Sequence, residues 1–297
     1  MANYFDTRGN PQKIYMRLAL IGIAMLIFPF VASNFGNSWV RIMDFALMYI
    51  MLALGLNIVV GFAGLLDMGY IAFYALGAYM SGLLASPQFA VVLESLVNHY
   101  PAIGNALVGI FGPEIAQNGI HLSVWFIVPL GAALAGFFGI LLGAPTLKLR
   151  GDYLTVVTLG FGEIIRILII NLNDPVNITD GPKGINMIDP IRIFSVSLHG
   201  EAGSNATVRL GSFSMPSVNA YYFLFLSLCI GIIFVTVRLQ NSRLGRAFVA
   251  IREDETAAKA MGINTSNIKL LAFAMGASFG GVAGSMFAAF QGYISPE

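Results

Sequence analysis

Residues 122–143 read LSVWFIVPLGAALAGFFGILLG, a run of 22 residues that contains no charged side chain. A helix needs about 20 consecutive apolar residues to cross the hydrocarbon core of a bilayer, so this stretch is long enough to span a membrane. The rest of the chain has the same character, since 57% of its 297 residues are hydrophobic and 10% are charged. Soluble proteins average about 45 to 50% apolar and about 25% charged residues. The composition therefore indicates a polytopic membrane protein and excludes a soluble globular domain.

Six further apolar runs bring the predicted number of transmembrane helices to about seven. None of the seven runs alternates with the two-residue period of a membrane β-strand, so the fold class is expected to be all-α. The first run is short and follows Arg8, Lys13 and Arg17, which also fits a cleaved signal peptide. Retention is preferred because cleavage would invert the agreement between topology and charge described below. The predicted spans are residues 18–32, 42–60, 69–85, 122–143, 153–170, 218–237 and 268–290, and residues 1–297 are taken as one transmembrane domain.

The few charges are almost balanced, with sixteen Lys and Arg against fifteen Asp and Glu and a formal net charge of +1. No broad basic surface is expected, so nucleic acid is not an expected partner. Cys229 is the only cysteine, which leaves no partner for a disulfide or for a cysteine zinc site. The three histidines, at positions 99, 121 and 199, stand at no metal-ligand spacing. No metal and no catalytic residue is therefore predicted.

The basic residues also indicate an orientation in the membrane. If the N-terminus is cytoplasmic, eleven Lys and Arg fall in inner segments and four fall in outer segments. Short cytoplasmic loops are enriched in Lys and Arg, so this asymmetry predicts a cytoplasmic N-terminus. Residues 238–267 then form a cytoplasmic loop, and residues 86–121 and 171–217 form exoplasmic loops.

One predicted span carries ionisable residues. At about 100° per residue, Thr155, Glu163 and Arg166 fall on one stripe of the helix over residues 152–173, and the opposite side is apolar. An ionisable group in a membrane normally faces protein or a water-filled cavity, because burying its charge in hydrocarbon is costly. Glu163 and Arg166 are three residues apart and close enough to pair. The pair fits either a structural role that holds helices together or a place on a solute pathway.

Glycines and polar residues also gather where the second and third predicted spans meet. Such a segment suits an interrupted helix, and in transporters interrupted helices often line the substrate site. An ordinary tight turn with its Asp facing the cytosol is the alternative. The candidate pathway residues of this segment are Asn57, Gly61, Gly64, Asp67 and Gly69. Two series with a four-residue period, 131–143 and 276–284, are predicted to be glycine packing seams between helices.

The cytoplasmic loop 238–267 has the pattern of an amphipathic helix. Leu244, Phe248, Ile251 and Ala258 share one face, and Gly262 is placed to end the helix. Glu255 precedes Lys259 by four residues, a spacing that allows an ion pair. A helix of this kind docks either on another protein surface or on the lipid surface.

Three stretches together carry a resemblance to a known family. They read LGLNIVVGFAGLLDMG at residues 54–69, LKLRGDYLTVVTLGFGEIIR at 147–166 and AIREDETAAKAMG at 250–262. The sequence resembles the LivM-type permease subunits of branched-chain amino acid ATP-binding-cassette (ABC) importers over nearly its whole length. The third stretch, residues 250–262, resembles the loop through which the permeases of this family contact their ATPase. The residues that match or flank this coupling pattern are Phe248, Ile251, Arg252, Glu253, Glu255, Ala257, Ala258 and Gly262, with Thr256 standing where the family pattern has Glu.

The resemblance implies a function and a set of partners. It implies a transport subunit, not an enzyme, for branched-chain or related amino acids in the bacterial plasma (inner) membrane. The implied partners are a homologous second permease, two ABC ATPases and an external substrate-binding protein. The sequence contains no Gly-Lys pair and hence no phosphate-binding loop, so no cofactor is expected in this chain and ATP would be used by the partners. The family pattern also implies further membrane-embedded helices after residue 297.

Two other functions remain open at this stage. Related permeases carry urea or short amides, which is the alternative within the same class. An ion-driven secondary transporter that uses Asp67 or Glu163 as its carrier site is the alternative from another class. An intramembrane enzyme is disfavoured, because Cys229 is the only cysteine or histidine inside a predicted span.

Overall fold

A computed structural model describes residues 11–146, 152–193, 196–198, 207–210 and 213–296. Arg8, Lys148 and Arg150, which were counted among the inner basic residues, lie outside this part of the chain, and so does His199. The described chain is mainly helical, and its elements are α1 (Pro11–Ser33), α2 (Asn37–Asn57), η1 (Ile58–Phe62), α3 (Ile71–Leu84), α4 (Gln88–His99), α5 (Pro101–Phe111), α6 (Pro113–Asn118), α7 (Val124–Thr146), α8 (Asp152–Asn171), η2 (Gly181–Lys183), β1 (Ile185–Asn186), β2 (Arg192–Ile193), β3 (Val196–Ser197), β4 (Thr207–Leu210), β5 (Phe213–Pro216), α9 (Ser217–Gln240), α10 (Arg243–Glu253), α11 (Glu255–Ala260), α12 (Thr265–Gln291) and β6 (Tyr293–Ile294).

Five continuous helices of the described chain are long and apolar enough to cross a bilayer. They cover Asn37–Phe62, Val124–Thr146, Tyr153–Asn171, Ser217–Gln240 and Thr265–Gln291, and each coincides with most or all of one predicted span. The all-α polytopic fold is therefore confirmed. The count of seven is not confirmed, because the described helices give five spans, or six if a bent pair is taken as one span.

The first and the third predicted spans do not form single helices that are long and apolar enough to cross a bilayer. In α1 the described apolar part, Leu20–Ser33, is shorter than a crossing. The predicted span 69–85 corresponds to α3, which has 14 residues and is therefore only about 21 Å long. Helix α4 follows at an angle of 79°. The predicted exoplasmic segment 86–121 contains α4, α5 and α6, so it is largely helical.

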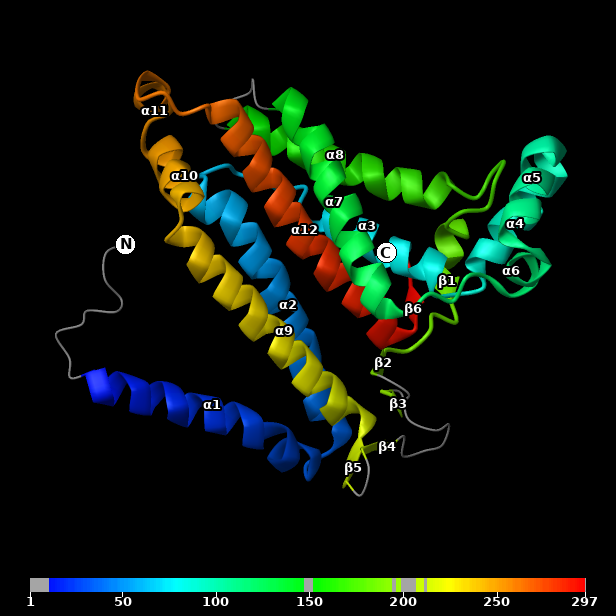
Figure 1. The fold of residues 1–297 in the computed structure, drawn as a ribbon, viewed down its shortest axis with the longest axis horizontal. Helices are drawn as coiled ribbons and strands as arrows, with labels where there is room; N and C mark the ends of the chain where they lie inside the picture. Colours follow the sequence, from blue (N-terminus) through cyan, green and yellow to red (C-terminus); the bar gives the residue numbers. More distant parts are fainter. Residues whose placement is uncertain (1–10, 147–151, 194–195, 199–206, 211–212, 297) are drawn as a thin grey trace.

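Helix α12 lies at the centre of the helix bundle and packs against α7, α3 and α2, while α2 also packs against α9 (Figure 1). Glycines allow the close packing. A Cβ atom on Gly77 of α3 would collide with the backbone of Gly281, and one on Gly139 of α7 would lie 2.8 Å from Ala277 Cβ. The side chain of Ser285 donates a hydrogen bond of 3.0 Å to the Gly77 carbonyl at the same crossing. The predicted glycine seams are thus confirmed as helix contacts.

The connecting segments gather at two opposite ends of the bundle (Figure 1). At the end that we call the β end, β1 pairs antiparallel with β6, and Gln88 Nε2 donates a hydrogen bond of 3.1 Å to the Asn177 carbonyl. His121 and Asp189 form an ion pair of 2.6 Å there. At the α10/α11 end, these two short helices cover the ends of η1 and α12.

Candidate functional site

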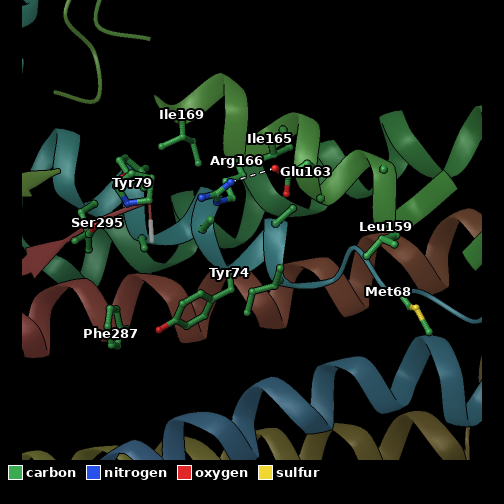
Figure 2. A pocket seen from close by; sticks show the side chains of 18 of the residues that line it. Met68, Tyr74, Tyr79, Leu159, Glu163, Ile165, Arg166, Ile169, Phe287 and Ser295 are labelled. Carbon is green, nitrogen blue, oxygen red and sulfur yellow. Dashed lines mark hydrogen bonds and ion pairs between the residues drawn. The ribbon is translucent and has the colours of Figure 1, made fainter. Parts of the chain in front are cut away.

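A cavity of about 1030 Å³ lies between α3 and α8, with side chains of α2, α12 and residues 294–296 completing its walls. We call it the α3–α8 cavity. Most of its lining is apolar and includes Ala75 of α3, Leu159, Ile165 and Ile169 of α8, and Phe287 of α12 (Figure 2). A largely apolar cavity with a few polar groups is the usual form of a small-molecule site in proteins.

Glu163 and Arg166 are the charged residues in the wall of the α3–α8 cavity (Figure 2). Arg166 Nη1 donates a hydrogen bond of 3.1 Å to Glu163 Oε1. Both side chains remain open to the cavity, with 47% of Arg166 and 57% of Glu163 exposed. The pair joins two residues of the same helix, so it does not tie α8 to a neighbouring helix. An ion pair this exposed typically contributes about 0 to 1 kcal/mol to stability, so it can open at little cost.

The interruption expected where the second and third predicted spans meet is present after Phe62. Helix α2 continues into the π-helix η1, where the amide of Ala63 donates to the Ile58 carbonyl across five residues. Residues 63–70 then run without regular helix to α3. Gly64 adopts a left-handed backbone with φ of 70°, a conformation that glycine reaches without strain. π-helical turns are rare and occur frequently at functional sites.

Asp67 stabilises the turn that follows the break. Its Oδ1 accepts a hydrogen bond of 2.9 Å from the Gly69 amide. The side chain is buried, and its Oδ2 has no hydrogen-bond partner among the described residues. The alternative prediction was an ordinary tight turn with Asp67 facing the cytosol. The turn is present, but the side chain of Asp67 is buried.

Thr158 of α8 holds this turn against the α3–α8 cavity wall. Its Oγ1 accepts a hydrogen bond of 3.1 Å from the Met68 amide, and its backbone leaves no room for a side chain at Gly69. Thr158 is not among the predicted site residues, although a second threonine three residues after Thr155 was a visible signal. Thr155 itself lies outside the cavity lining, and its Oγ1 is buried.

The structure thus separates the eight predicted pathway residues into groups. Glu163 and Arg166 line the α3–α8 cavity, while Asp67 and Gly69 line a smaller neighbouring cavity of about 280 Å³. Neither cavity is lined by the other four residues, which are Asn57, Gly61, Gly64 and Thr155.

Asp44 is a second residue that the sequence analysis missed. It lies within α2, is fully buried, and has no hydrogen-bond partner for either carboxylate oxygen among the described residues. The signal was present, because an ionisable residue inside a predicted span is exceptional. Asp44 lies outside the α3–α8 cavity lining.

The predicted coupling segment forms two short helices with polar N-caps. Ser242 accepts a hydrogen bond from the Gly245 amide at the start of α10, and Asp254 accepts from the Thr256 and Ala257 amides at the start of α11. Gly262 follows α11 with a left-handed φ of 83°, which confirms its predicted role in ending the helix.

Most of the predicted apolar face of this segment packs on the chain itself, whereas Leu244 is 36% exposed. Phe248, Ile251 and Ala258 are buried, and Phe248 packs with Val59 and Phe273 in one hydrophobic cluster. In this conformation these three side chains position α10 and α11 and are closed to a partner. The remaining predicted coupling residues that are exposed are Arg252, Glu253, Ala257 and Gly262. Met261, which the sequence analysis omitted, is 69% exposed beside them.

Glu255 is held by two lysines. The predicted pair with Lys259 is confirmed at 3.2 Å, and a second pair joins Glu255 to the buried Lys269 of α12 at 2.8 Å. Burial of the carboxyl group would raise its pKa, but the hydrogen bonds from Lys269 and Lys259 outweigh this effect and lower the pKa of Glu255 to about 2. Glu255 therefore fastens α11 to α12, and the neighbouring Glu253, which pairs with Arg252 at 3.1 Å, is the more exposed carboxylate at 71%.

Arg252 connects the same segment to the helix break. Its guanidinium Nη1 donates a hydrogen bond of 2.7 Å to the Gly61 carbonyl, at the C-terminal end of η1. A cation is favourable at this position because the exposed carbonyls of a helix C-terminus carry partial negative charge.

Comparison with known proteins adds a decisive observation. Residues 38–297 match the family described as the permease component of the branched-chain amino acid transport system. The chain belongs to this family. The match includes the helix break, the α3–α8 cavity and the α10/α11 end. No solved structure matches the chain.

Several curated members of the branched-chain permease family resemble the chain closely. It is 38% identical over 292 residues to the high-affinity branched-chain amino acid transport system permease protein LivM of Escherichia coli, and equally so to that of Salmonella typhimurium. Each alignment covers 96% of this chain and 59% of the relative, so the chain spans about three fifths of their length. The probable LivM of Methanocaldococcus jannaschii is 26% identical over 249 residues, which is 80% of this chain and 66% of the relative.

A shorter likeness links the chain to a differently named permease of the same system. The LivH protein of Salmonella typhimurium is 40% identical over 62 residues, which is 21% of this chain and 20% of that protein. Family membership thus rests on the long LivM-type alignments, and the LivH likeness is local.

Proposed function

We propose that this chain is a transmembrane permease subunit of an ATP-driven importer for branched-chain or related amino acids. The observation that carries the proposal is the α3–α8 cavity, which has mainly apolar walls and one pair of opposite charges. Its volume of about 1030 Å³ is at the upper end of the range for small-molecule sites, so a single amino acid fits with room for water. The names of the LivM relatives supply the substrate class.

Separate ATPase subunits would supply the energy. The sequence has no phosphate-binding loop, since it contains no Gly-Lys pair. The proposed docking surface for the ATPase is the exposed face of α10 and α11, formed by Glu253, Ala257, Met261 and Gly262. Three buried side chains hold this face in place on the bundle, so a force applied to it would reach η1 and α12.

The proposed assembly contains a second, homologous permease, two ATPases and an external binding protein. The local likeness to LivH supports a second permease of related sequence. In this proposal the α10/α11 end faces the cytosol and the β end faces the binding protein, and the chain lies in the bacterial inner membrane with its N-terminus inside. The positive-inside count supports that orientation.

The urea or short-amide permease remains the second candidate within the class. A charged pair in the cavity favours an amino acid, because urea and short amides carry no charges for Glu163 and Arg166 to pair with. Ion-driven transport by this chain alone is disfavoured, because Glu163 is paired and Asp67 is committed to the turn at Gly69.

Uptake measurements test the proposal. Membrane vesicles that contain the full complex should accumulate labelled leucine, isoleucine and valine when ATP is present and the ion gradients are clamped. Unlabelled urea in excess should leave this uptake unchanged. Uptake that persists without ATP and follows an imposed ion gradient would reject the importer, and inhibition by urea would favour the second candidate.

A further inference from the structure

The α3–α8 cavity presents a positive and a negative group side by side against apolar walls. Arg166 and Glu163 lie within 3.1 Å of each other, and about half of each side chain is exposed to the cavity. Within the described chain, each of the two has the other as its ion-pair partner. The charges sum to zero, so the site carries no uncompensated charge when it is empty.

This arrangement matches the charges of an α-amino acid. At neutral pH an amino acid carries an ammonium group and a carboxylate on the same carbon, and the two groups together are also neutral. A guanidinium group binds a carboxylate through two parallel hydrogen bonds, and a carboxylate accepts from an ammonium group. A bound amino acid would therefore exchange one ion pair within α8 for two ion pairs across the site.

We propose that Glu163 binds the α-ammonium group of the substrate and Arg166 binds its α-carboxylate. This assignment rests on the proposed function and adds the mode of recognition. Leu159, Ile165 and Ile169 of α8 and Phe287 of α12 line the same cavity, so the side chain of a substrate held by the pair meets apolar surface (Figure 2). Selection for an amino acid comes from the charged pair, and preference for an apolar side chain comes from these walls.

The structural alternative for the pair fits the geometry less well. An ion pair that holds helices together joins residues of different helices. It is usually buried, so that removal of one residue leaves the charge of the other without a partner. Glu163 and Arg166 lie on one helix, one turn apart, and both are half exposed. Their place on the cavity wall is therefore better explained by a ligand than by helix packing.

Protection of a cysteine in the cavity tests the assignment directly. Ala75 of α3 lines the cavity and is partly exposed, so Ala75→Cys in a Cys229→Ala background places a single thiol there. The variant is assembled with its second permease and ATPases in lipid nanodiscs, without the external binding protein. The rate of modification by N-ethylmaleimide is then measured with L-leucine, with 3-methylbutylamine, which lacks the carboxylate, and with 4-methylpentanoate, which lacks the ammonium group.

L-Leucine should protect the thiol, and neither analogue should do so at the same concentration. At about ten times the Kd, leucine slows modification about tenfold, because only the free fraction reacts. Glu163→Gln with Arg166→Gln removes both charges and should weaken protection about 10- to 100-fold, the value of hydrogen bonds to charged groups. Glu94→Gln on α4, an exposed carboxylate outside the cavity lining, is the matched control and should leave protection unchanged.

Each other outcome overturns the assignment. Equal protection by leucine and both analogues would show a purely apolar site. Protection that survives in the double variant would show that leucine binds there without the pair, and absence of protection in a complex that still transports leucine would place the substrate elsewhere. If the double variant does not assemble, the comparison of L-leucine with its two analogues on the Ala75→Cys chain still tests whether the site requires both charged groups of the substrate. Failure of ATP-driven leucine uptake, in contrast, would count against the proposed function itself.

Discussion

The guanidinium group of Arg252 donates a hydrogen bond of 2.7 Å to the carbonyl of Gly61, and this contact joins α10 to the C-terminal end of η1. The stem of the Arg252 side chain lies directly against Gly64, where a Cβ atom would collide with it. Three residues beyond Gly64, Asp67 shapes the turn that Thr158 holds on α8. A displacement of α10 therefore has a continuous path of contacts to the helix that carries Glu163 and Arg166.

Arg252→Gln should uncouple ATP hydrolysis from uptake. The shorter neutral side chain cannot span the distance to Gly61, so we expect uptake to fall severalfold while ATPase activity continues. Loss of this partly exposed hydrogen bond should cost about 1 kcal/mol of stability, seen as a small fall in the Tm of the purified complex. Arg246→Gln is the matched control, because Arg246 bonds to Asn241 within its own segment. Equal effects of the two substitutions would contradict the path of contacts from α10 to α8.

Glu255→Gln should loosen α11 from α12. The buried Lys269 would lose its carboxylate partner, which should cost about 1 to 3 kcal/mol, the usual cost of leaving a buried polar group without its partner. The effect has a defined pH range. Because the folded protein lowers the pKa of Glu255 from 4.5 to about 2, its stabilisation is complete above about pH 4.5 and is lost as the pH falls toward 2. The Tm of the parent should fall more steeply across this range than that of Glu255→Gln, and parallel curves would contradict the assignment.

Gly69→Ala should push α8 away from the turn at residues 63–70. The added methyl group would meet the backbone carbonyl of Thr158, and a backbone cannot rotate aside as a side chain does. Overpacking of this kind typically costs about 1 to 3 kcal/mol. We expect a lower yield of folded complex and a lower Tm. Gly231→Ala on α9 is the control, because a Cβ atom there meets nothing within 4 Å, and an equal loss in that variant would refute the steric explanation.

His121 should make the β end sensitive to pH. The hydrogen bond to Asp189 raises the pKa of His121 above its usual value of 6.5. The protonated pair therefore stabilises the fold fully below about pH 6.5, and this contribution disappears as the pH rises through the higher pKa of the folded state. The pair is partly exposed, so the effect should be below about 1 kcal/mol. The Tm difference between the parent and His121→Asn should shrink from pH 6 to pH 9, and a constant difference would contradict the titration.

The two ends of the bundle should lie on opposite sides of the membrane. Asn105 on α5 and Gln240 at the end of α9 are both exposed and suit single-cysteine labelling in a Cys229→Ala background. In intact cells an impermeant maleimide should label Asn105→Cys and leave Gln240→Cys unlabelled until the membrane is opened. The opposite pattern would invert the proposed orientation.

Local spacing in the sequence was sufficient to predict several features of the site. The stripe that places Glu163 beside Arg166 follows from the 100° rotation per residue, and the interruption between the second and third predicted spans follows from glycines that weaken a helix. The Glu255–Lys259 pair follows from its four-residue spacing. Each of these features depends on residues that are close in the chain.

Features that depend on distant residues were not predictable in the same way. Lys269, the stronger partner of Glu255, belongs to another helix, so periodicity within the loop gives no sign of it. The 79° bend after α3 has a local marker in Ser86 and Pro87, but its angle depends on how α4 packs. The burial of Phe248 shows the same difficulty. An apolar helix face predicts a packing partner, but the pattern does not reveal whether that partner is another protein or, as here, the same chain.

The π-helical turn at residues 58–62 takes up one residue more than a regular helical turn. A π-helix closes its hydrogen bonds over five residues where an α-helix closes them over four, so η1 behaves as an α-helix with one residue inserted. Because the wide turn absorbs that residue, deletion of one residue there would restore the regular pattern and leave Met68 beside Thr158. Deletion of one residue within α2 would instead rotate the residues that follow by about 100°. Among natural relatives, one-residue differences in length should therefore be found in this turn and be absent from α2.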